Sequence, residues 1–408
     1  MAAQSAPSLS ARALRKLASY RLVGKALHAA RPPAYPGLKL TPKRLLNYHV
    51  VKLQRSLGHT KLLGKPLTLT LEATNVCNLN CPYCFTGVNE VGRTRSMMSM
   101  EQYQRLLDEL GDYALAIDFY NWGEPLLNKN IYEMIRLAAD RGLSTIISTN
   151  FSVPFDRERA EKLVRSGLAA LGAGVDGARQ ESLEQYRVGA DFEKVIANLK
   201  LLVEAKRALG SDTPAITWSF HVFEHNRHEI EEARAHAAEL GIQFEASKGW
   251  VAGEEWDPND EVAFPANTGP SASRCKYLWE YAIVNNDGGV APCAACFYKE
   301  DDFGSAETRS FKSVWNNTAF QTARKLFQSR DVPGGQDLIC HQCPYTLAWE
   351  HYQRHRARGL PKSTFEPGYT TNDWVNYFFS RKPGVFTMAD VPGAVELQPV
   401  DAPGRGAS

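Results

Sequence analysis

Residues 74–85 read Thr-Asn-Val-Cys-Asn-Leu-Asn-Cys-Pro-Tyr-Cys-Phe. Their cysteines, Cys77, Cys81 and Cys84, have the spacing C-x3-C-x2-C, so three thiolates can face one centre from a single loop. A closed structural zinc site needs four ligands and usually pairs two C-x2-C knuckles, and no fourth cysteine lies nearby. A four-iron cluster held by three thiolates leaves one iron free of protein. A small molecule can bind that open iron.

Strand and helix patterns alternate on the C-terminal side of residue 66. Six apolar runs are expected to be strands: 67–71, 114–119, 143–147, 168–175, 216–223 and 242–244. Amphipathic segments of helical length separate most of them, namely 100–110, 130–141, 157–166, 192–208 and 227–240. This order predicts parallel βα units in an α/β fold, either an open doubly wound sheet or a partial barrel. In both architectures chemistry gathers where strands end, which is where the cysteine loop lies.

The cysteine loop, with an aromatic residue directly after its last cysteine, resembles the signature of radical S-adenosylmethionine (SAM) enzymes. The resemblance implies a partial (β/α)6 TIM-like barrel and a first [4Fe-4S] cluster on Cys77, Cys81 and Cys84, with SAM chelated by the open iron. In that family an electron from the cluster cleaves SAM, and the resulting 5′-deoxyadenosyl radical abstracts hydrogen from the substrate. A flavodoxin- or ferredoxin-type electron donor is implied as well.

Further strand ends carry segments that match this family at the expected places. Residues 121–125, Asn-Trp-Gly-Glu-Pro, resemble the family's Gly-Gly-Glu motif, with Trp122 in place of the first glycine. The resemblance makes the following residues expected SAM contacts: Phe85, Gly123, Glu124, Ser148, Asn150, Asp176 and Arg187. Read without the family, Gly-Glu-Pro is a common turn into a helix, Asp176 is a candidate cap of the next helix, and Arg187 is a candidate surface residue.

A second group of cysteines follows residue 250. Cys275 and Cys293 flank an Asn-Asp-Gly-Gly hairpin signal, and Cys340 and Cys343 form a C-x2-C knuckle. On spacing alone, four thiolates in two pairs fit either zinc or a four-iron cluster. The segment resembles the SPASM/twitch region of radical SAM enzymes, which implies that these four cysteines hold one auxiliary [4Fe-4S] cluster. The version with two auxiliary clusters needs more cysteines than this segment has.

Cys296 is left over from both sets. It is expected to be a small buried thiol or a substitute ligand. The alternative is a catalytic role as a hydrogen-atom donor that quenches a substrate radical, as cysteines do in radical epimerases. A thiol S–H bond is weak enough for that role.

The charge distribution sets the N-terminal part of the chain apart. Residues 1–71 contain thirteen Lys or Arg and no acidic residue, whereas the whole 408-residue chain has a net charge of only +2. Two helices are expected, over 9–30 and from Thr41-Pro42 onward, the second with an apolar stripe of Leu46, Val50, Leu53 and Leu57. We expect both helices to pack on the body by their apolar faces. The alternative is a surface for an anionic partner such as a membrane.

Four domains are expected: a basic helical extension over 1–65, the radical SAM barrel over 66–255, the auxiliary-cluster domain over 256–345, and a C-terminal extension over 346–408. The Pro- and Gly-rich end of the last is expected to be disordered. No apolar run is long enough to span a bilayer, and the start of the chain lacks a secretory signal pattern. The expected location is therefore cytoplasmic, with peripheral contact to the inner membrane face through the basic segment, and no nucleic-acid partner is expected.

The expected function is hydrogen abstraction from a small-molecule or carbohydrate-type substrate, anionic or lipid-linked, leading to dehydrogenation or epimerisation with help from the auxiliary cluster. The helical N-terminal extension favours this over the alternative, crosslinking or epimerisation of a ribosomally made peptide, because it shows no hairpin of a leader-peptide recognition domain. Glu224, His221 and His225 near the fifth strand are candidate substrate-facing acids or bases. A non-catalytic iron–sulfur protein or a zinc-binding adaptor is least favoured, because neither needs an open iron beside a cofactor pocket.

Overall fold

The structure is a computed structural model that describes residues 32–249, 270–307, 309–368 and 371–379. The chain divides into two compact units, Met1–Tyr35 and Pro36–Ser408, and the second contains all the helices and strands given below. The helix predicted over 9–30, the domain boundary expected near residue 255 and the tail after residue 379 lie outside the described residues.

The strands and helices follow the predicted order. The strands are β1 Thr68–Leu71, β2 Ala116–Asp118, β3 Ser144–Thr149, β4 Ala170–Gly174, β5 Ala215–Val222, β6 Gln243–Lys248, β7 Tyr281–Val284, β8 Gly289–Ala291 and β9 Gly304–Ser305. The α-helices are α2 Pro42–Leu57, α3 Met100–Leu110, α4 Ile131–Asp140, α5 Arg157–Arg165, α6 Gln180–Tyr186, α7 Phe192–Ala208, α8 Ile230–Leu240, α9 Tyr277–Glu280, α10 Phe311–Trp315, α11 Thr318–Lys325, α12 Pro344–Ala357 and α13 Thr371–Phe379. Short 3-10 helices are η1 Pro125–Leu127, η2 Arg227–Glu229, η4 Lys299–Asp301 and η5 Lys362–Thr364. Each predicted strand and helix between residues 67 and 244 is present, and the short α6 is additional.

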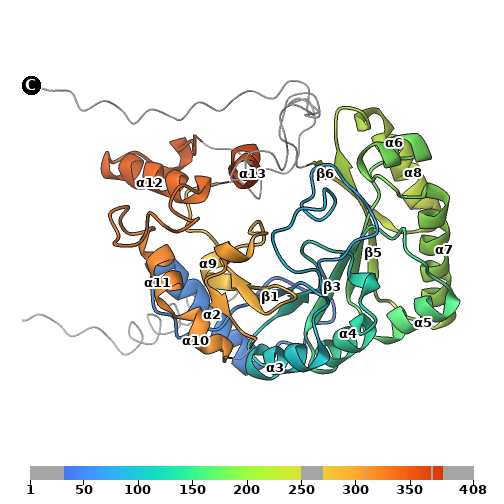
Figure 1. Cartoon of the computed structure of the whole chain (residues 1–408), viewed down its shortest axis with the longest axis horizontal. Helices are drawn as coiled ribbons and strands as arrows, with labels where there is room; N and C mark the ends of the chain where they lie inside the picture. Colours follow the sequence, from blue (N-terminus) through green and yellow to red (C-terminus); the bar gives the residue numbers. More distant parts are fainter. Residues whose placement is uncertain (1–31, 250–269, 308, 369–370, 380–408) are drawn as a thin grey trace, which may run out of the picture. The chain divides into compact units, whose positions relative to one another are not determined.

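One nine-stranded sheet has the order β6-β5-β4-β3-β2-β1-β7-β8-β9. Strands β1 to β7 pair in parallel, and β8 and β9 are antiparallel. Figure 1 shows α3, α4, α5 and α7 along the outer side of this curved sheet. The predicted partial (β/α)6 barrel is confirmed. The hairpin of the second cysteine region joins the same sheet, because β7 pairs with β1.

The two faces of the sheet differ in polarity. Residues paired directly across parallel strands share a face, so the strand register assigns each side chain. The outer face is apolar and buried, and includes Leu69, Ile117, Ile147, Leu171 and Trp218. The inner face carries Thr70, Asp118, Ser148, Thr217 and Gln243. Packing of the outer face against helices therefore supplies the core, and the inner face keeps hydrogen-bonding groups for a bound molecule.

Helix α2 begins where the sequence predicts. The Thr41 side chain accepts a hydrogen bond from the backbone N of Arg44, Pro42 occupies the first turn, and Gly58 ends the helix at φ 74°. The expectation that its apolar stripe packs on the body is wrong. Leu46, Leu53 and Leu57 are 67%, 59% and 58% exposed.

The buried face of α2 is polar because it satisfies backbone groups of its neighbours. The buried Arg44 guanidinium donates to the carbonyls of Gly111, Arg141 and Gly142, at 2.8 to 3.0 Å. These carbonyls lie at the C-terminal ends of α3 and α4, where helices leave acceptors unpaired and where the helix dipole favours a cation. These three hydrogen bonds stabilise the packing of the polar face of α2 more than burial of its apolar stripe would. No helix in the described ranges is both long enough and apolar enough to cross a membrane.

Candidate active site and the second cysteine cluster

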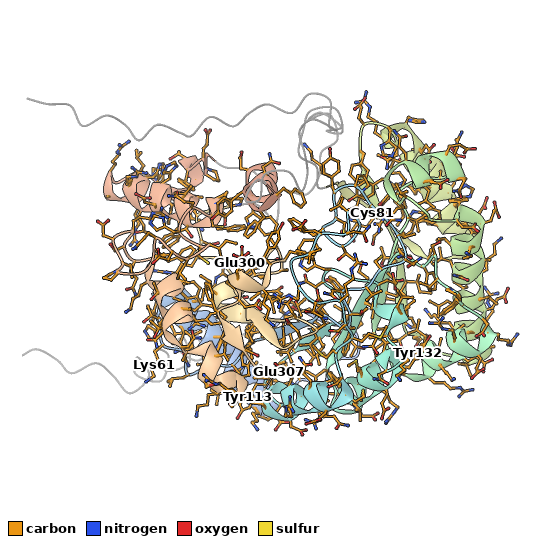
Figure 2. All side chains as sticks on the ribbon, in the orientation of Figure 1. Lys61, Cys81, Tyr113, Tyr132, Glu300 and Glu307 are labelled. Atoms are coloured by element: carbon orange, nitrogen blue, oxygen red, sulfur yellow. The ribbon has the colours of Figure 1, made fainter. Side chains whose placement is uncertain are left out.

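The loop after β1 holds Cys77, Cys81 and Cys84 at the carboxyl edge of the sheet. Backbone contacts fix it: Thr74 forms an isolated bridge with Met97, and the backbone N of Asn80 donates to the carbonyl of Val188 at 3.0 Å. Figure 2 shows Cys81 on the inner side of the helical layer. The predicted position of the three thiols, on one loop directly after the first strand, is confirmed. Their role as cluster ligands stays a prediction.

All three thiols have raised pKa values. Burial raises the pKa of Cys77 to about 11 and that of Cys81 to about 12, and it raises the pKa of Cys84 in the same direction. The positive charge of Arg187 acts against burial at each thiol. The unloaded site therefore holds protonated thiols at neutral pH, so binding of iron must release protons.

Gly123 brings the end of β2 against the cysteine loop. A Cβ at this position would lie 2.0 Å from the carbonyl oxygen of Thr74 and 2.9 Å from Cα of Asn75. Any other residue would push the two segments apart, so the glycine is required by close backbone approach. The next residue continues the contact, since the backbone N of Glu124 donates to the carbonyl of Val76 at 2.9 Å.

The Glu124 carboxylate is buried and ties η1 to the end of β3. It accepts hydrogen bonds from the Thr149 hydroxyl at 2.7 Å and from the backbone N atoms of Asn150 and Leu126 at 2.8 and 3.0 Å. Burial raises its pKa, and these three donors act in the opposite direction. Glu124 thus positions the two strand ends that the sequence predicts to meet SAM. Its own contact with the cofactor stays a prediction.

Asp176, Arg187 and His221 form one network at the ends of β4 and β5. The Arg187 Nε donates to the Asp176 carboxylate at 2.6 Å, and the backbone N of His221 donates to its other oxygen at 2.7 Å. Burial alone would raise the pKa of Asp176, but Arg187 and His221 outweigh burial and hold that pKa well below its usual range. A Cβ on Gly174 would lie 2.5 Å from the Arg187 guanidinium, so the glycine makes room for it. Arg187 is therefore a partly buried cation, 16% exposed, whose charge acts on the thiols.

The end of β3 supplies amide and hydroxyl groups beside the cysteine loop. The Asn150 Nδ2 lies 3.6 Å from the sulfur of Cys77 and donates to the Asn78 side chain at 3.1 Å. Ser148 is exposed on the inner face of the sheet. Of these two predicted SAM contacts, Asn150 adjoins the thiols directly and Ser148 faces the barrel interior.

Phe85 is the centre of an aromatic cluster that joins the cysteine loop to the second cysteine region. Its ring stacks on Phe297 with centroids 4.9 Å apart and meets Trp122, Tyr298 and Phe379 at 5.3 to 5.5 Å. Only 1% of Phe85 is exposed. The structure accordingly gives Phe85 a packing role, and its predicted contact with SAM stays a prediction.

The second cysteine set lies around one apolar cavity. Cys275, Cys293, Cys340 and Cys343 all line it, together with aromatic side chains that include Tyr277, Phe327, Tyr345, Trp374 and Phe378. The predicted hairpin is present as β7 and β8, and it brings Cys275 and Cys293 together. Among the described residues no three His, Cys, Asp or Glu side chains are close enough to hold a single metal ion. Four thiols around one space fit either zinc or a four-iron cluster, so the choice between them stays a prediction.

Cys296 lies behind this cavity. It is fully buried, its sulfur is 3.5 Å from that of Cys293, and it is not among the cavity-lining residues. Burial and the neighbouring Cys293 raise its pKa well above the ordinary value. The position fits the expected buried thiol or substitute ligand better than a thiol that meets substrate, and neither role is tested.

Arg93, which the sequence did not single out, joins the cysteine loop to the hairpin. Its guanidinium donates to both carboxylate oxygens of Asp302 at 2.8 Å and to Asp287 at 2.7 Å, and only 2% of its side chain is exposed. Beside it the backbone N of Lys299 donates to the carbonyl of Gly92 at 3.0 Å. In the sequence, only the acidic residues Asp287 and Asp302, at and after the Asn-Asp-Gly-Gly turn, could have indicated that a buried cation pairs with this region.

Asp118 is a second residue that the sequence analysis missed. It lies at the end of β2 on the inner face, where burial raises its pKa to about 7 against a hydrogen bond from Thr70 and the charge of Lys276. Its charge in turn raises the pKa of Tyr120, which also lies near Tyr281. The sequence could have pointed to Asp118 as a functional residue, because it is a single acid between the apolar Ile117 and Phe119. Burying a carboxyl in a strand costs free energy, so such a residue is seldom kept without a functional or structural role.

The three residues named as substrate-facing acids or bases lie near one another but have different surroundings. His221 contacts Asp176, and 37% of its side chain is exposed. His225 lies 3.3 Å from the carbonyl of Ser182, and burial lowers its pKa. Glu224 forms an ion pair with Arg227 at 3.3 Å. A role for any of them with substrate stays a prediction.

Two family models match the chain. Residues 71–235 match the radical SAM superfamily, and residues 275–344 match the iron-sulfur cluster-binding domain called SPASM. The curved sheet with its three-thiol loop and four-thiol cavity is thus that of a radical SAM enzyme. The chain belongs to the SPASM group of this family, whose two domains bind SAM and iron–sulfur clusters.

Known relatives cover much of the chain at modest identity. The PqqA peptide cyclase of Bradyrhizobium diazoefficiens is 27% identical over 334 residues, covering 77% of this chain and 80% of the relative. The AdoMet-dependent heme synthase of Methanosarcina barkeri is 28% identical over 203 residues, covering 50% of this chain and 56% of the relative. The structure of Streptococcus suis SuiB bound to S-adenosylmethionine has a TM-score of 0.52 at 17% identity, covering 69% of this chain and 72% of SuiB. SuiB bound to precursor peptide SuiA has a TM-score of 0.51 at 13% identity, covering 75% and 78%. The SuiB comparisons support the fold.

Proposed function

We propose that this chain is a radical SAM enzyme that modifies a ribosomally made peptide. The cyclase relative is named for the peptide PqqA and is matched over 80% of its length, and SuiB has been solved with its precursor peptide. The heme synthase is matched over only 56% of its length. These relatives support a peptide better than the small-molecule or carbohydrate substrate expected from the N-terminal extension.

The observation that carries the proposal is the polar inner face of the sheet. Strands β1, β2, β3, β5 and β6 contribute hydrogen-bonding side chains there, namely Thr70, Asp118, Ser148, Thr217 and Gln243, whereas β4 contributes Ala170 and Gly172. A peptide presents backbone donors and acceptors along its whole length, and each costs free energy if it is buried without a partner. An inner face with polar side chains on five strands can satisfy many of them.

The cysteines divide into two proposed ligand sets. Cys77, Cys81 and Cys84 hold the SAM-binding cluster, and the auxiliary cluster is held by Cys275, Cys293, Cys340 and Cys343. When bound, the first cluster and SAM supply the 5′-deoxyadenosyl radical that takes a hydrogen atom from the peptide. Gly123 and Glu124 keep the loop at the strand ends, and Asp176 orients Arg187 for a charge-assisted contact with the SAM carboxylate.

Asp118 is the proposed proton acceptor. A peptide that becomes crosslinked or dehydrogenated would lose two hydrogens, one as an atom and one as a proton, and a cluster held by the four-thiol set would supply an acceptor for the remaining electron. A carboxyl whose pKa is about 7 is suited to receive that proton near neutral pH. The charge of Lys276, which follows Cys275 in the chain, acts on Asp118, and this supports a proton acceptor on the auxiliary-cluster side of the inner face.

The test is anaerobic turnover of the reconstituted enzyme with SAM, dithionite and a short peptide encoded beside its gene. A crosslinked or dehydrogenated product is lighter by two hydrogen atoms, whereas an epimerised product keeps its mass in ordinary water and gains one deuterium in deuterated water. The Cys77→Ala variant is the control and should leave the peptide unchanged. 5′-Deoxyadenosine formed with no change in the peptide would count against a peptide substrate.

The ligand assignment has its own test with matched cysteine variants. Cys343→Ser should lower the iron content from about eight to about four per chain, while Cys296→Ser should keep about eight. An equal loss of iron in both variants would refute the division between ligands and surplus thiol. If Cys296 returns a hydrogen atom to the peptide, Cys296→Ser should keep its iron and lose the deuterium incorporation.

A further inference from the structure

Exposed apolar side chains gather on and around helix α2. Five of the nine exposed large apolar residues in the described ranges fall within residues 40–63, namely Leu40, Leu46, Leu53, Leu57 and Leu63. On α2, Leu46, Leu53 and Leu57 are seven and four residues apart, so their side chains share one face of the helix. The opposite face, with Arg44, packs against the ends of α3 and α4. Helix α2 therefore turns its apolar side to the solvent, as surfaces that bind a partner do.

The surroundings of this apolar face are cationic. Residues 36–71 contain seven Lys or Arg and no acidic residue. Lys39, Lys43 and Lys61 are exposed, and Lys43 forms an ion pair with Asp112. Positive charge beside an exposed apolar face suits a partner that offers both negative charge and apolar contact.

A cavity of about 400 Å³ lies beside the C-terminal half of α2. Ser56 lines the cavity and directly precedes Leu57, so the cavity borders the apolar face. None of the described residues that line it is acidic, and four are cations: Lys52, Arg55, Arg274 and Arg356. The cavity is therefore suited to a negatively charged group.

The cations of the cavity are held in place but only partly neutralised. Lys52 and Arg55 both pair with Glu280, at 2.9 and 2.8 Å, so one carboxylate serves two cations. Arg274 donates to the backbone carbonyl of Arg55, and its guanidinium lies 4.6 Å from the ring centroid of Trp349. The Nε of Arg274 is buried and has no hydrogen-bond partner among the described residues. A bound anion would supply the missing acceptor.

The shape and charge of this surface favour a lipid membrane over a second copy of the chain. Two copies joined through α2 would bring cations against cations, because residues 36–71 carry no acidic side chain. The face of a helix is convex, so a rigid partner needs a groove that matches it, whereas the headgroup layer of a membrane deforms around it. Anionic lipids supply both a phosphate for the cavity and acyl chains for the leucines.

We infer that the apolar face of α2 lies on the surface of a membrane that contains anionic lipids, with a lipid phosphate in the adjoining cationic cavity. The leucines enter the boundary between headgroups and acyl chains, and the surrounding cations attract the negative surface. The inference is independent of the proposed peptide substrate, because the lining of the cavity includes none of the cysteines.

The experiment measures binding of the cluster-loaded full chain to vesicles by co-sedimentation, without peptide or turnover. One set of vesicles contains phosphatidylcholine and phosphatidylglycerol in equal parts, and the other contains phosphatidylcholine alone. The double variant Leu53→Ser/Leu57→Ser tests the apolar face. Val91→Ser is its control, because Val91 is 89% exposed but lies outside residues 40–63.

The cavity is tested with Arg356→Glu. Its control is Arg165→Glu, because Arg165 is also exposed but is on α5, across the barrel from α12 (Figure 1). All the substituted side chains are exposed, so each variant should unfold at about the same urea concentration as the parent.

The parent should bind the anionic vesicles and bind phosphatidylcholine alone at least about 10-fold more weakly. The double serine variant and Arg356→Glu should each lower the affinity for anionic vesicles about 10-fold or more, while the two controls behave as the parent. The effect of Arg356→Glu should vanish at about 0.5 M salt, where the screening length is about 4 Å.

Three other results would overturn the inference. No binding by the parent, or equal binding by the parent and all variants, would exclude α2 as the lipid contact and leave the proposed function untouched. A parent dimer that the double serine variant converts to a monomer, without vesicle binding, would assign the face to a second copy. Weaker binding of an acidic precursor peptide by the same variants, again without vesicle binding, would assign it to the peptide.

Discussion

Replacing Arg93 with methionine should destabilise the contact between the cysteine loop and the hairpin of the SPASM domain. Arg93 is the cation shared by Asp287 and Asp302, whose side chains are only 14% and 7% exposed. Methionine keeps much of the side-chain volume and removes the charge and the donors. Two nearly buried carboxylates are then left without their counter-ion.

The magnitude follows from the burial of this network. Removing one partner of a buried ion pair typically costs about 3–5 kcal/mol, because the remaining charge stays desolvated. Here the cost is limited, because burial already raises the pKa of Asp302 to about 6 against the pull of Arg93. Without Arg93 that pKa rises further and the carboxyl takes up a proton, at about 1.4 kcal/mol for each pH unit. We expect a loss of about 3 kcal/mol in the free energy of unfolding at pH 7.

The dependence on pH has a definite sign. The pKa of Asp302 is raised from 3.8 to about 6 on folding, so the folded chain holds more protons between these values and its stability falls as pH rises through that window. In Arg93→Met the window extends to higher pH. The deficit of the variant relative to the parent should therefore be small at pH 5 and grow toward pH 8.

The measurement is urea unfolding of parent and variant under anaerobic conditions, followed by tryptophan fluorescence at pH 5, 6, 7 and 8. Arg136→Met is the matched control, because Arg136 forms only exposed ion pairs on α4 with Glu133 and Asp140. It should change the free energy of unfolding by less than about 0.5 kcal/mol. A deficit below about 1 kcal/mol for Arg93→Met, or one that shrinks as pH rises, would refute the reasoning.

Three further predictions concern the site and the fold. Gly123→Ala places a methyl group 2.0 Å from the Thr74 carbonyl, so it should displace the cysteine loop. The iron content should then fall from about eight to about four per chain, and calorimetry should detect no SAM binding. A variant that keeps its full iron content and its SAM binding would contradict the close approach. Asp118→Asn should slow peptide modification about 100-fold while 5′-deoxyadenosine still forms. Parent turnover should rise with pH through about 7, as the carboxyl loses its proton, and the variant should lack this inflection; an unchanged profile would exclude Asp118 as the acceptor. Leu53→Ser should change the free energy of unfolding by less than about 0.5 kcal/mol in urea unfolding. Asn47→Ala removes hydrogen bonds to the Lys65 and Tyr113 carbonyls and should lower that free energy by about 1–3 kcal/mol. If Leu53→Ser were the more destabilising variant, the apolar stripe of α2 would be its packed face.

Local patterns predicted most of the scaffold. Strand and helix periods between residues 67 and 244 are set by neighbours in sequence, so alternating apolar runs were enough to place each of β1 to β6. Local sequence also predicted the hairpin of β7 and β8, because its Asn-Asp-Gly-Gly turn fixes the pairing of the two strands. Local sequence did not predict which face of α2 packs on the body. It depends on unpaired carbonyls at the ends of α3 and α4, which only the folded chain brings to Arg44.

Cysteine spacing alone was enough to predict the family and the place of its chemistry, since three cysteines on one loop after the first strand have few other uses. Tertiary structure decided which polar groups lie beside them. It enclosed Phe85 in an aromatic cluster, paired Asp176 with Arg187, put Arg93 between two acids and left Asp118 on the inner face. Spacing along the chain fixes which residues share a loop, whereas burial and ion pairing depend on how separate segments pack, as in the pairs that Arg93 forms with Asp287 and Asp302 about two hundred residues away.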